Sequence, residues 1–308
     1  MKSIILLFTI LFTFTASADE LKVNTYGNNE DNAIIFLHGG PGYNAANFDV
    51  TTAERLSENG FFVIVYDRRG EGRNESLEAK FTFDETFADI NWIMEKYGVE
   101  KTSFIGHSFG GIVATKYAEK FPNKVETIYL VGAPVSLQET FKTIITTVKK
   151  IYEEKNDATN LGYVKMLENM DTTSIQYSSY CFMHAMQNGF YTTKTPTDEA
   201  KEQYKMLQND KEMMELSKQM NFKAPTGFAN NESYTTIDLT EGIDNILEQD
   251  IEVYGIYGKE DGLYSEEQIV SLSNQIGKKN MLYLDNCSHN VFVDRQTKFI
   301  EAIVEWSK

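Results

Sequence analysis

The sequence predicts an α/β fold: a mostly parallel twisted sheet flanked by helices, with an inserted block of helices. Two observations carry this prediction. Short apolar runs of strand length, rich in Val, Ile, Phe and Tyr, alternate with amphipathic stretches along most of the chain. One long segment without a convincing strand interrupts that alternation. Because strand–helix–strand crossovers are right-handed, reactive residues are expected where strands end and helices begin, at the carboxyl edge of the sheet.

Apolar runs of strand length mark the predicted strands. They are Ala33–Leu37, Phe61–Tyr66, Thr102–Ile105, Val125–Val131, Ile251–Tyr257 and Asn280–Leu284. The helix-like segments are Asp84–Tyr97, Phe109–Phe121, Ser265–Ile276 and Val291–Trp306. Strands that alternate with helices favour a parallel sheet with both faces covered.

The interrupting segment, from Ser136 to Asp238, is rich in Lys, Glu, Gln, Met and Tyr. It is predicted to form several helices, among them Glu139–Glu154 and Asp198–Gln219. A block of about 100 residues is too long for a loop, and we interpret it as a lid over the sheet edge. The expected division is a core of residues 19–135 and 241–308 and a helical cap of residues 136–240.

The N-terminus is typical of an export signal. Lys2 precedes the apolar run Ile4–Phe14, and Ala16-Ser17-Ala18 offers a small-residue cleavage site. The run is well short of the roughly 20 apolar residues that cross a bilayer. We therefore expect residues 1–18 to be a signal peptide cleaved near Ala18, leaving a periplasmic or secreted protein with no stable membrane insertion.

Composition excludes several classes of protein. The chain has 308 residues, 42% of them hydrophobic, and a formal net charge of −16 with no basic patch, which argues against nucleic-acid binding. Its two cysteines, Cys181 and Cys287, are too few for a disulfide framework and lack the His neighbours of a structural zinc site. Export would allow them to pair, and burial as free thiols is the alternative.

A G-x-S-x-G motif, Gly106-His107-Ser108-Phe109-Gly110, follows one predicted strand and opens a predicted helix. In that context the glycines leave room for a strained turn that exposes the serine hydroxyl. The N–H groups at the helix N-terminus, beginning with Phe109, would face a developing anion. Ser108 is therefore the candidate nucleophile and Phe109 a candidate oxyanion donor.

A second oxyanion donor is expected from His38-Gly39-Gly40-Pro41-Gly42, which follows the strand Ala33–Leu37. Glycines let the backbone approach a substrate oxygen closely. Pro41 has no N–H, so Gly40 is the candidate donor, with Gly42 as the alternative. A phosphate-binding loop would instead require a P-loop or G-x-G-x-x-G pattern, and neither is present here.

The serine needs a base, and the chain has four histidines. His289 is the candidate, because it lies between the last strand and the last helix; His184, in the cap, is interpreted as a packing residue. Asp261 follows the strand Ile251–Tyr257 and is the candidate to orient His289, in the chain order Ser, Asp, His. Glu260 and Asp285 are its competitors.

Together these residues resemble the α/β-hydrolases, and the first two motifs, His38–Gly42 and Asp67–Arg73, resemble the proline iminopeptidase group of serine peptidases. The resemblance runs from about Ala33 to the C-terminus and implies the triad and oxyanion donors named above. It also implies that Asp67–Arg73 is a structural turn at the floor of the site.

Three departures limit what the resemblance implies about the substrate. His107 and Phe109 flank the serine as in esterases of the same fold, where the peptidases usually have Gly and Trp. Gln187 stands where a loose match to the peptidases would place a lid glutamate that binds the substrate amine. Many relatives also lack an export signal.

The sequence therefore predicts an exported serine hydrolase that acts through an acyl-enzyme on a small molecule or short peptide, with no metal or organic cofactor. An aminopeptidase that removes an N-terminal proline or small residue is the first hypothesis. A carboxylesterase or lactonase on small acyl substrates is the second, and a non-catalytic binding protein on a hydrolase scaffold is the third.

Overall fold

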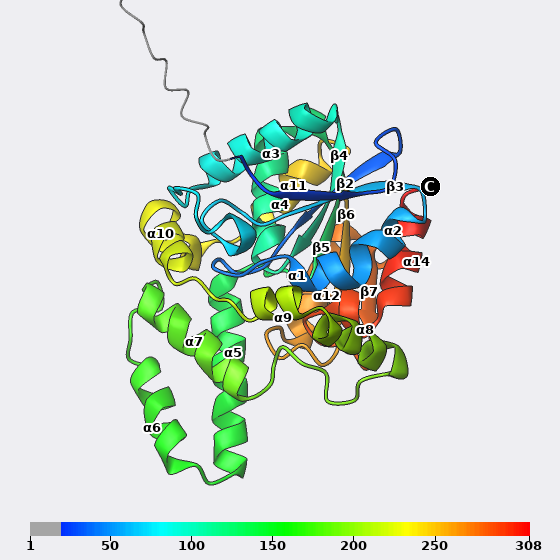
Figure 1. Ribbon diagram of the computed structural model, residues 1–308. Coiled ribbons are helices and arrows are strands. Elements are labelled where there is room, and N and C mark those ends of the chain that lie inside the picture. Colours follow the sequence, from blue (N-terminus) through cyan, green and yellow to red (C-terminus); the bar gives the residue numbers. More distant parts are fainter. Residues whose placement is uncertain (1–19) are drawn as a thin grey trace, which may run out of the picture.

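Within residues 20–308 the strands form one mixed sheet of seven, in the order β1-β3-β2-β4-β5-β6-β7 (Figure 1). The computed structural model describes residues 20–308, so the expected signal peptide lies outside the described residues. β2 to β7 are parallel to one another, and β1 pairs antiparallel with β3 at one edge. The strands are β1 Val23–Tyr26, β2 Asn32–Leu37, β3 Phe61–Tyr66, β4 Thr102–His107, β5 Val125–Val131, β6 Glu252–Gly258 and β7 Met281–Leu284.

Helices cover both faces because alternate strand residues point to opposite sides. In β2, Ile35 and Leu37 belong to one hydrophobic core, and Ile34 and Phe36 belong to the other. The first face carries α3 Phe83–Tyr97, α4 Phe109–Lys120, α11 Thr240–Leu247 and α12 Glu266–Ile276. The second carries α1 Ala46–Phe48, a π-helical turn Asp49–Ala53, α2 Glu54–Ser57, α13 Val291–Asp294 and α14 Gln296–Trp306. The predicted α/β fold is confirmed.

An insertion of helices lies between β5 and β6, as predicted, and α5 to α7 extend away from the sheet (Figure 1). Its two ends are tied together, because Leu137 N–H donates to Ile237 O at 3.0 Å and Leu239 N–H donates to Val135 O at 2.7 Å. The helices are α5 Leu137–Glu154, α6 Ala158–Leu167, α7 Ile175–Gln187, α8 Asp198–Asn209, α9 Lys211–Ser217 and α10 Lys223–Glu232.

Two expected helices are each divided in two. The segment Asp198–Gln219 breaks at Asp210, whose carboxylate accepts the N–H of Met213 and so caps α9. The segment Val291–Trp306 breaks at Arg295, whose backbone leaves the helical region at φ −140° and ψ 50°. Among residues 20–308, no helix combines the length and the apolar character needed to span a membrane.

Candidate active site

Ser108 occupies the sharp turn between β4 and α4. Its backbone has φ 53° and ψ −123°, an unusual conformation for a residue with a side chain, and its N–H donates to Val131 O at 3.0 Å. A Cβ on Gly110 would lie 1.9 Å from Leu37 O, so α4 can cross β2 this closely only with glycine at that position. The turn required by the G-x-S-x-G motif is therefore present.

The glycine loop after β2 lies against this turn. A Cβ on Gly39 would be 3.0 Å from Ser108 Cβ, and Gly40, at φ 111°, lines the pocket beside Ser108. Gly42 N–H is already taken, because it donates to Glu71 Oε1 at 2.5 Å. Within residues 20–308 the N–H groups of Gly40 and Phe109 have no hydrogen-bond acceptor. Of the two glycines left open by the sequence, only Gly40 keeps an N–H for a substrate.

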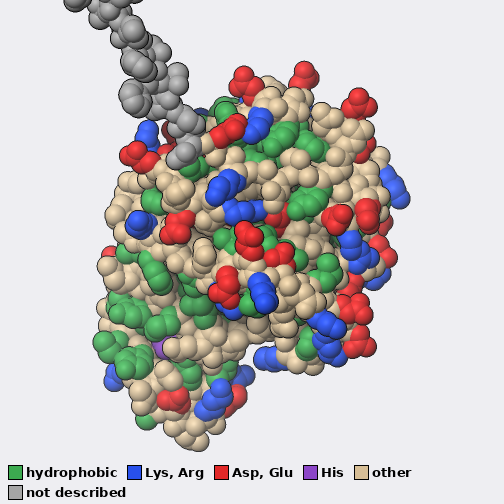
Figure 2. All heavy atoms as spheres, in the orientation of Figure 1, with side chains coloured by type: hydrophobic (Ala, Val, Ile, Leu, Met, Phe, Trp, Pro, Cys, Tyr) green, Lys and Arg blue, Asp and Glu red, His purple; other side chains and the backbone are tan. Residues whose placement is uncertain are grey.

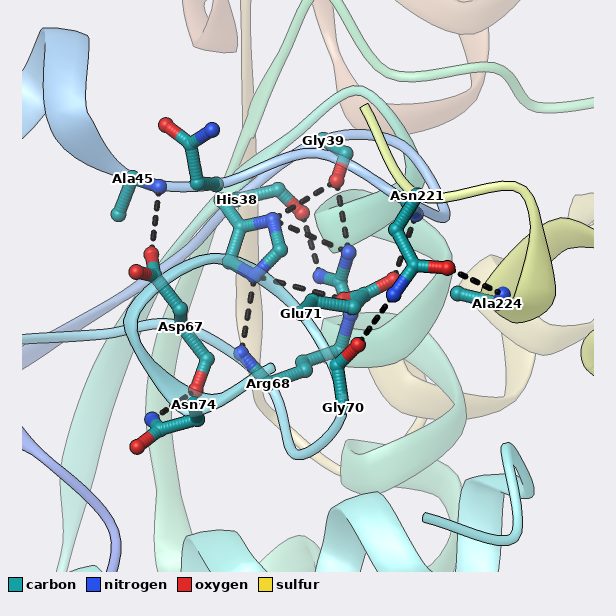
Figure 3. Close-up of polar contacts among 12 residues, drawn as sticks. His38, Gly39, Ala45, Asp67, Arg68, Gly70, Glu71, Asn74, Asn221 and Ala224 are labelled. Atoms are coloured by element: carbon teal, nitrogen blue, oxygen red, sulfur yellow. Dashed lines mark hydrogen bonds and ion pairs between the residues drawn. The ribbon is translucent and has the colours of Figure 1, made fainter. Parts of the chain in front are cut away.

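A buried polar network lies under the glycine loop (Figure 3). Arg68, 3% exposed, donates from Nη1 to His38 O at 2.6 Å and from Nη2 to Gly39 O at 2.7 Å. Arg68 Nε lies 2.6 Å from Glu71 Oε2, an ion pair without hydrogen-bond alignment. Burial raises the pKa of Glu71, and the charge of Arg68 opposes that rise. The turn expected to shape the floor of the site therefore holds the glycine loop directly.

His38 belongs to this network as a neutral ring. Its Nε2 accepts the backbone N–H of Arg68 at 3.0 Å, which places its proton on Nδ1, 2.8 Å from Gly39 O. Burial, followed by the charge of Arg68, lowers the pKa of His38 well below its ordinary value. His38 is therefore occupied within the loop and is not placed to act as a base.

His289 and Asp261 meet at the carboxyl ends of β7 and β6. His289 Nδ1 lies 2.8 Å from Asp261 Oδ2, and the two residues are 3% and 6% exposed. The competing carboxylates lie elsewhere: Glu260 accepts from Thr193 and Thr195, and Asp285 pairs with Lys259 at 2.9 Å. The contacts thus single out Asp261 as the partner of His289.

The His289 ring lies beside the Ser108 turn. A Cβ on Gly132, the residue after the Val131 that holds Ser108 N–H, would be 3.2 Å from His289 Nδ1. His107, the residue before Ser108, places Nε2 3.1 Å from His289 O. In the described chain no hydrogen bond joins Ser108 Oγ to the His289 ring; such contacts are often long in the absence of substrate.

Two tyrosine rings lie near the buried ring of His289. The Tyr191 ring meets the His289 ring edge-on at 5.1 Å, and the Tyr264 ring lies 6.3 Å away. Tyr264 also donates to Gly132 O at 2.7 Å and lines the pocket beside Ser108. No local motif marks these residues in the sequence, although Tyr264 is only three positions after Asp261.

A small pocket at Ser108 lies between the core and the inserted helices. The insertion supplies Leu137 and Thr140 from α5, Phe182 from α7, and Tyr234. The core supplies the rest: Gly40, Ser108, Phe109, Ile112, Pro134, Leu263 and Tyr264. Among the described residues none that lines this pocket carries a charge, and the ring of His289 is not part of its wall.

Gln187, suggested as a substrate ligand, is exposed at the end of α7 and does not line this pocket. The sequence did not predict the pocket residues of α5 and α7, because helical periodicity does not show which face of a helix meets the sheet edge.

His184 is buried and pairs with Tyr152 OH at 2.9 Å, consistent with packing inside the insertion. Cys181 and Cys287 are both buried free thiols.

No group of three or more His, Cys, Asp or Glu side chains able to hold a metal ion occurs within residues 20–308. The polar groups gathered at the site are instead a hydroxyl, an imidazole–carboxylate pair and backbone N–H groups. This is the set of groups that acyl transfer through a serine requires.

The family model described as alpha/beta hydrolase fold matches residues 32–296. The chain belongs to the α/β-hydrolase fold family. The proline iminopeptidase of Clostridioides difficile is 22% identical over 280 residues, 89% of this chain and 88% of that protein. The proline iminopeptidase of Thermoplasma volcanium is 30% identical over 132 residues, so the match spans 44% of its length.

One solved structure has a similar fold. The proline iminopeptidase-related protein of Thermus thermophilus superposes with a TM-score of 0.64 at 20% identity, covering 94% of each chain. This similarity shows the fold, and the match to proline iminopeptidases shows distant homology over most of the chain.

Proposed function

We propose that this α/β-hydrolase is a serine hydrolase that cleaves small, uncharged acyl substrates, with carboxylic esters as the preferred class. The uncharged pocket that opens on Ser108 is the observation that carries the proposal. We also propose, from the N-terminal sequence alone, that the enzyme acts after export.

In the proposed mechanism, Ser108 Oγ attacks the substrate carbonyl while His289 Nε2 takes its proton. Asp261, bound to His289 Nδ1, holds the ring in the tautomer that leaves Nε2 free to accept. The N–H groups of Gly40 and Phe109 stabilise the oxyanion. His289 then protonates the leaving alkoxide and activates the water that releases the acid from Ser108.

The character of the pocket bears on the substrate. Hydroxyls of Thr140, Tyr234 and Tyr264 are the polar side-chain groups of its wall besides Ser108. An ammonium group placed there would lose its hydration without gaining a carboxylate partner, which is unfavourable in a buried site. A neutral acyl group has no such cost.

An aminopeptidase acting on an N-terminal proline is the second candidate, favoured by the resemblance and by the similarity to proline iminopeptidases. It would require an amine-binding carboxylate beyond the wall of the pocket described above. A non-catalytic binding protein is the third, and the grouping of Ser108, His289 and Asp261 argues against it.

The test compares ester and amide substrates on the purified chain. We expect release of p-nitrophenol from p-nitrophenyl acetate and butyrate, and little release of p-nitroaniline from prolyl-p-nitroanilide. Ser108→Ala should lower the ester rate by about 10⁴-fold or more, and Ser179→Ala, an exposed serine of α7, should not. A higher kcat/KM for the prolyl amide would replace the esterase proposal with the aminopeptidase one. Absence of any Ser108-dependent turnover and of fluorophosphonate labelling would leave only the binding protein.

A further inference from the structure

Arg68 is buried under the glycine loop in an arrangement that a purely structural ion pair does not require. Its guanidinium reaches past its carboxylate partner, Glu71, to the carbonyl oxygens of both His38 and Gly39 (Figure 3). Its neighbour Arg69 instead forms an ordinary pair with Asp89 at 2.7 Å, with its side chain 27% exposed. The two adjacent arginines therefore have different surroundings.

The hydrogen bond to Gly39 O has a consequence for Gly40. A trans peptide places its C=O and N–H on opposite sides, and the only cis bond in residues 20–308 is the next one, Gly40–Pro41. Because Gly39 O points at Arg68, the N–H of Gly40 points away from Arg68. Gly40 lines the pocket beside Ser108, and its N–H has no acceptor within residues 20–308, so this N–H is available to a substrate oxygen.

The charge of Arg68 also lies close to Gly40 and to the side chain of Phe109. Nη2 is 3.3 Å from the position that a Cβ on Gly40 would occupy, and the guanidinium carbon is 5.2 Å from the centre of the Phe109 ring. A cation that binds the carbonyl of a peptide polarises that peptide and strengthens the donor at its other end. Glu71 is engaged by Gly42 N–H as well, so it is not devoted to Arg68 alone.

We propose that Arg68 is a positioning residue for the oxyanion hole: by holding Gly39 O it aims and polarises the N–H of Gly40. The inference rests on the proposed function, since it assigns a role within the same site. It predicts that Arg68 stabilises the tetrahedral intermediate and contributes little to binding of the substrate itself.

The test measures ester hydrolysis by Arg68→Met and the matched variant Arg69→Met. Removing an oxyanion donor outright costs about 10²–10³-fold in kcat; loss of its support in Arg68→Met should cost about 10–100-fold, with KM within about 3-fold of wild type. Affinity for a trifluoromethyl ketone, which forms a tetrahedral oxyanion on the serine, should fall by the same factor as kcat. Arg69→Met should leave kcat, KM and the affinity for the ketone unchanged.

Arg68→Lys serves where Arg68→Met does not fold, since it keeps the charge but not the two-pronged contact, and an intermediate loss of kcat and ketone affinity is expected. The proposal is overturned if kcat and ketone affinity of the folded variant match those of Arg69→Met, or if kcat, KM and ketone affinity change only in step with the melting temperature. Failure of the proposed function is separate, because wild type itself would then show no Ser108-dependent turnover.

Discussion

Individual charged side chains hold the turn after β3 in place. Asp67 is fully buried and accepts hydrogen bonds from Ala45 N at 2.7 Å, Arg73 N at 2.8 Å and Arg73 Nε at 2.7 Å. Burial alone would raise the pKa of Asp67, but the hydrogen bonds and charge of Arg73 hold it below its ordinary value. The ionised form is thus favoured by folding.

Asp67→Asn should lower the free energy of unfolding at pH 7 by roughly 3 kcal/mol, because it breaks a buried, hydrogen-bonded pair. A carboxylate with a depressed pKa stabilises the fold above its ordinary pKa, near 4, and that stability is lost as the pH falls through the lower folded value. The difference in melting temperature between wild type and variant should therefore become smaller as the pH falls from 7 toward 3.

The matched control for this experiment is Asp84→Asn. Asp84 pairs with Lys120 at the surface, with its side chain 79% exposed, so its replacement should change stability by less than about 1 kcal/mol. A gap between Asp67→Asn and wild type that stays constant down to pH 3 would contradict the role given to the ionised Asp67.

Residue types and spacing predicted which groups gather at the site, but they left specific choices open. The sequence favours Gly40 over Gly42 as oxyanion donor but leaves Gly42 as an alternative, and the contact of Glu71 with Gly42 N–H distinguishes them. Asp261 and Glu260 are adjacent, and only the loop geometry turns Asp261 toward His289. The catalytic roles of these residues stay predictions until the variants are measured.

Helix α4 and its neighbouring strands meet at a contact distance that only glycine permits. A Cβ on Gly110 would overlap Leu37 O, and the backbone fixes the positions of both atoms, so no side-chain rotation can relieve the overlap. Gly110→Ala should therefore displace α4 or β2 and lower the stability by about 3 kcal/mol or more. The melting temperature and the extent of fluorophosphonate labelling of Ser108 should both decrease in this variant.

Gly162→Ala is the matched control within α6. No atom lies within 4 Å of the position of its Cβ, and the residue is exposed. Alanine should stabilise this helix by up to about 1 kcal/mol, because glycine is the poorer helix former. Equal stability of the two alanine variants would show that the contact between α4 and β2 is not as tight as described.

Strongly apolar strands were predictable because they are buried on both faces, as in β3, where every residue is buried. β1 was missed, since its four residues lie at the sheet edge and only partly face the core. The helical turn Asp49–Ala53 is also not predicted, because Asp49, Thr51 and Thr52 are polar residues of a kind usually found at the surface. In the structure these residues are buried, and hydrogen bonds to residues distant in sequence satisfy Asp49 and Thr52. A local sequence pattern does not reveal hydrogen-bond partners that are distant in the sequence.

The molecule as a whole places its pocket between two layers, the sheet edge and the inserted helices. Figure 2 shows charged side chains scattered over one face, while hydrophobic ones gather near α6 and α7. Exposed apolar residues of those helices include Tyr163, Met166, Tyr180, Met183 and Met186. Phe182 of α7 is instead part of the pocket wall, so the insertion limits the space beside Ser108.

Phe182→Ala should therefore widen the pocket for longer acyl chains. We expect kcat/KM for p-nitrophenyl hexanoate, relative to acetate, to rise about 10-fold, since two or three more methylenes could be buried. Met183→Ala, the next residue, is 37% exposed and should leave that ratio unchanged. An unchanged ratio in Phe182→Ala would mean that the acyl chain lies elsewhere.

The order of the elements along the chain also governs when activity can arise during synthesis. The glycine loop follows β2, Ser108 follows β4, and His289 comes only after β7, the last strand made. A nascent chain that has completed β5 already contains Ser108, the proposed nucleophile, and the proposed oxyanion donors, but it lacks His289, the proposed base. On the proposed mechanism, the growing chain stays inactive until His289 has been synthesised and has met Asp261 at the sheet edge.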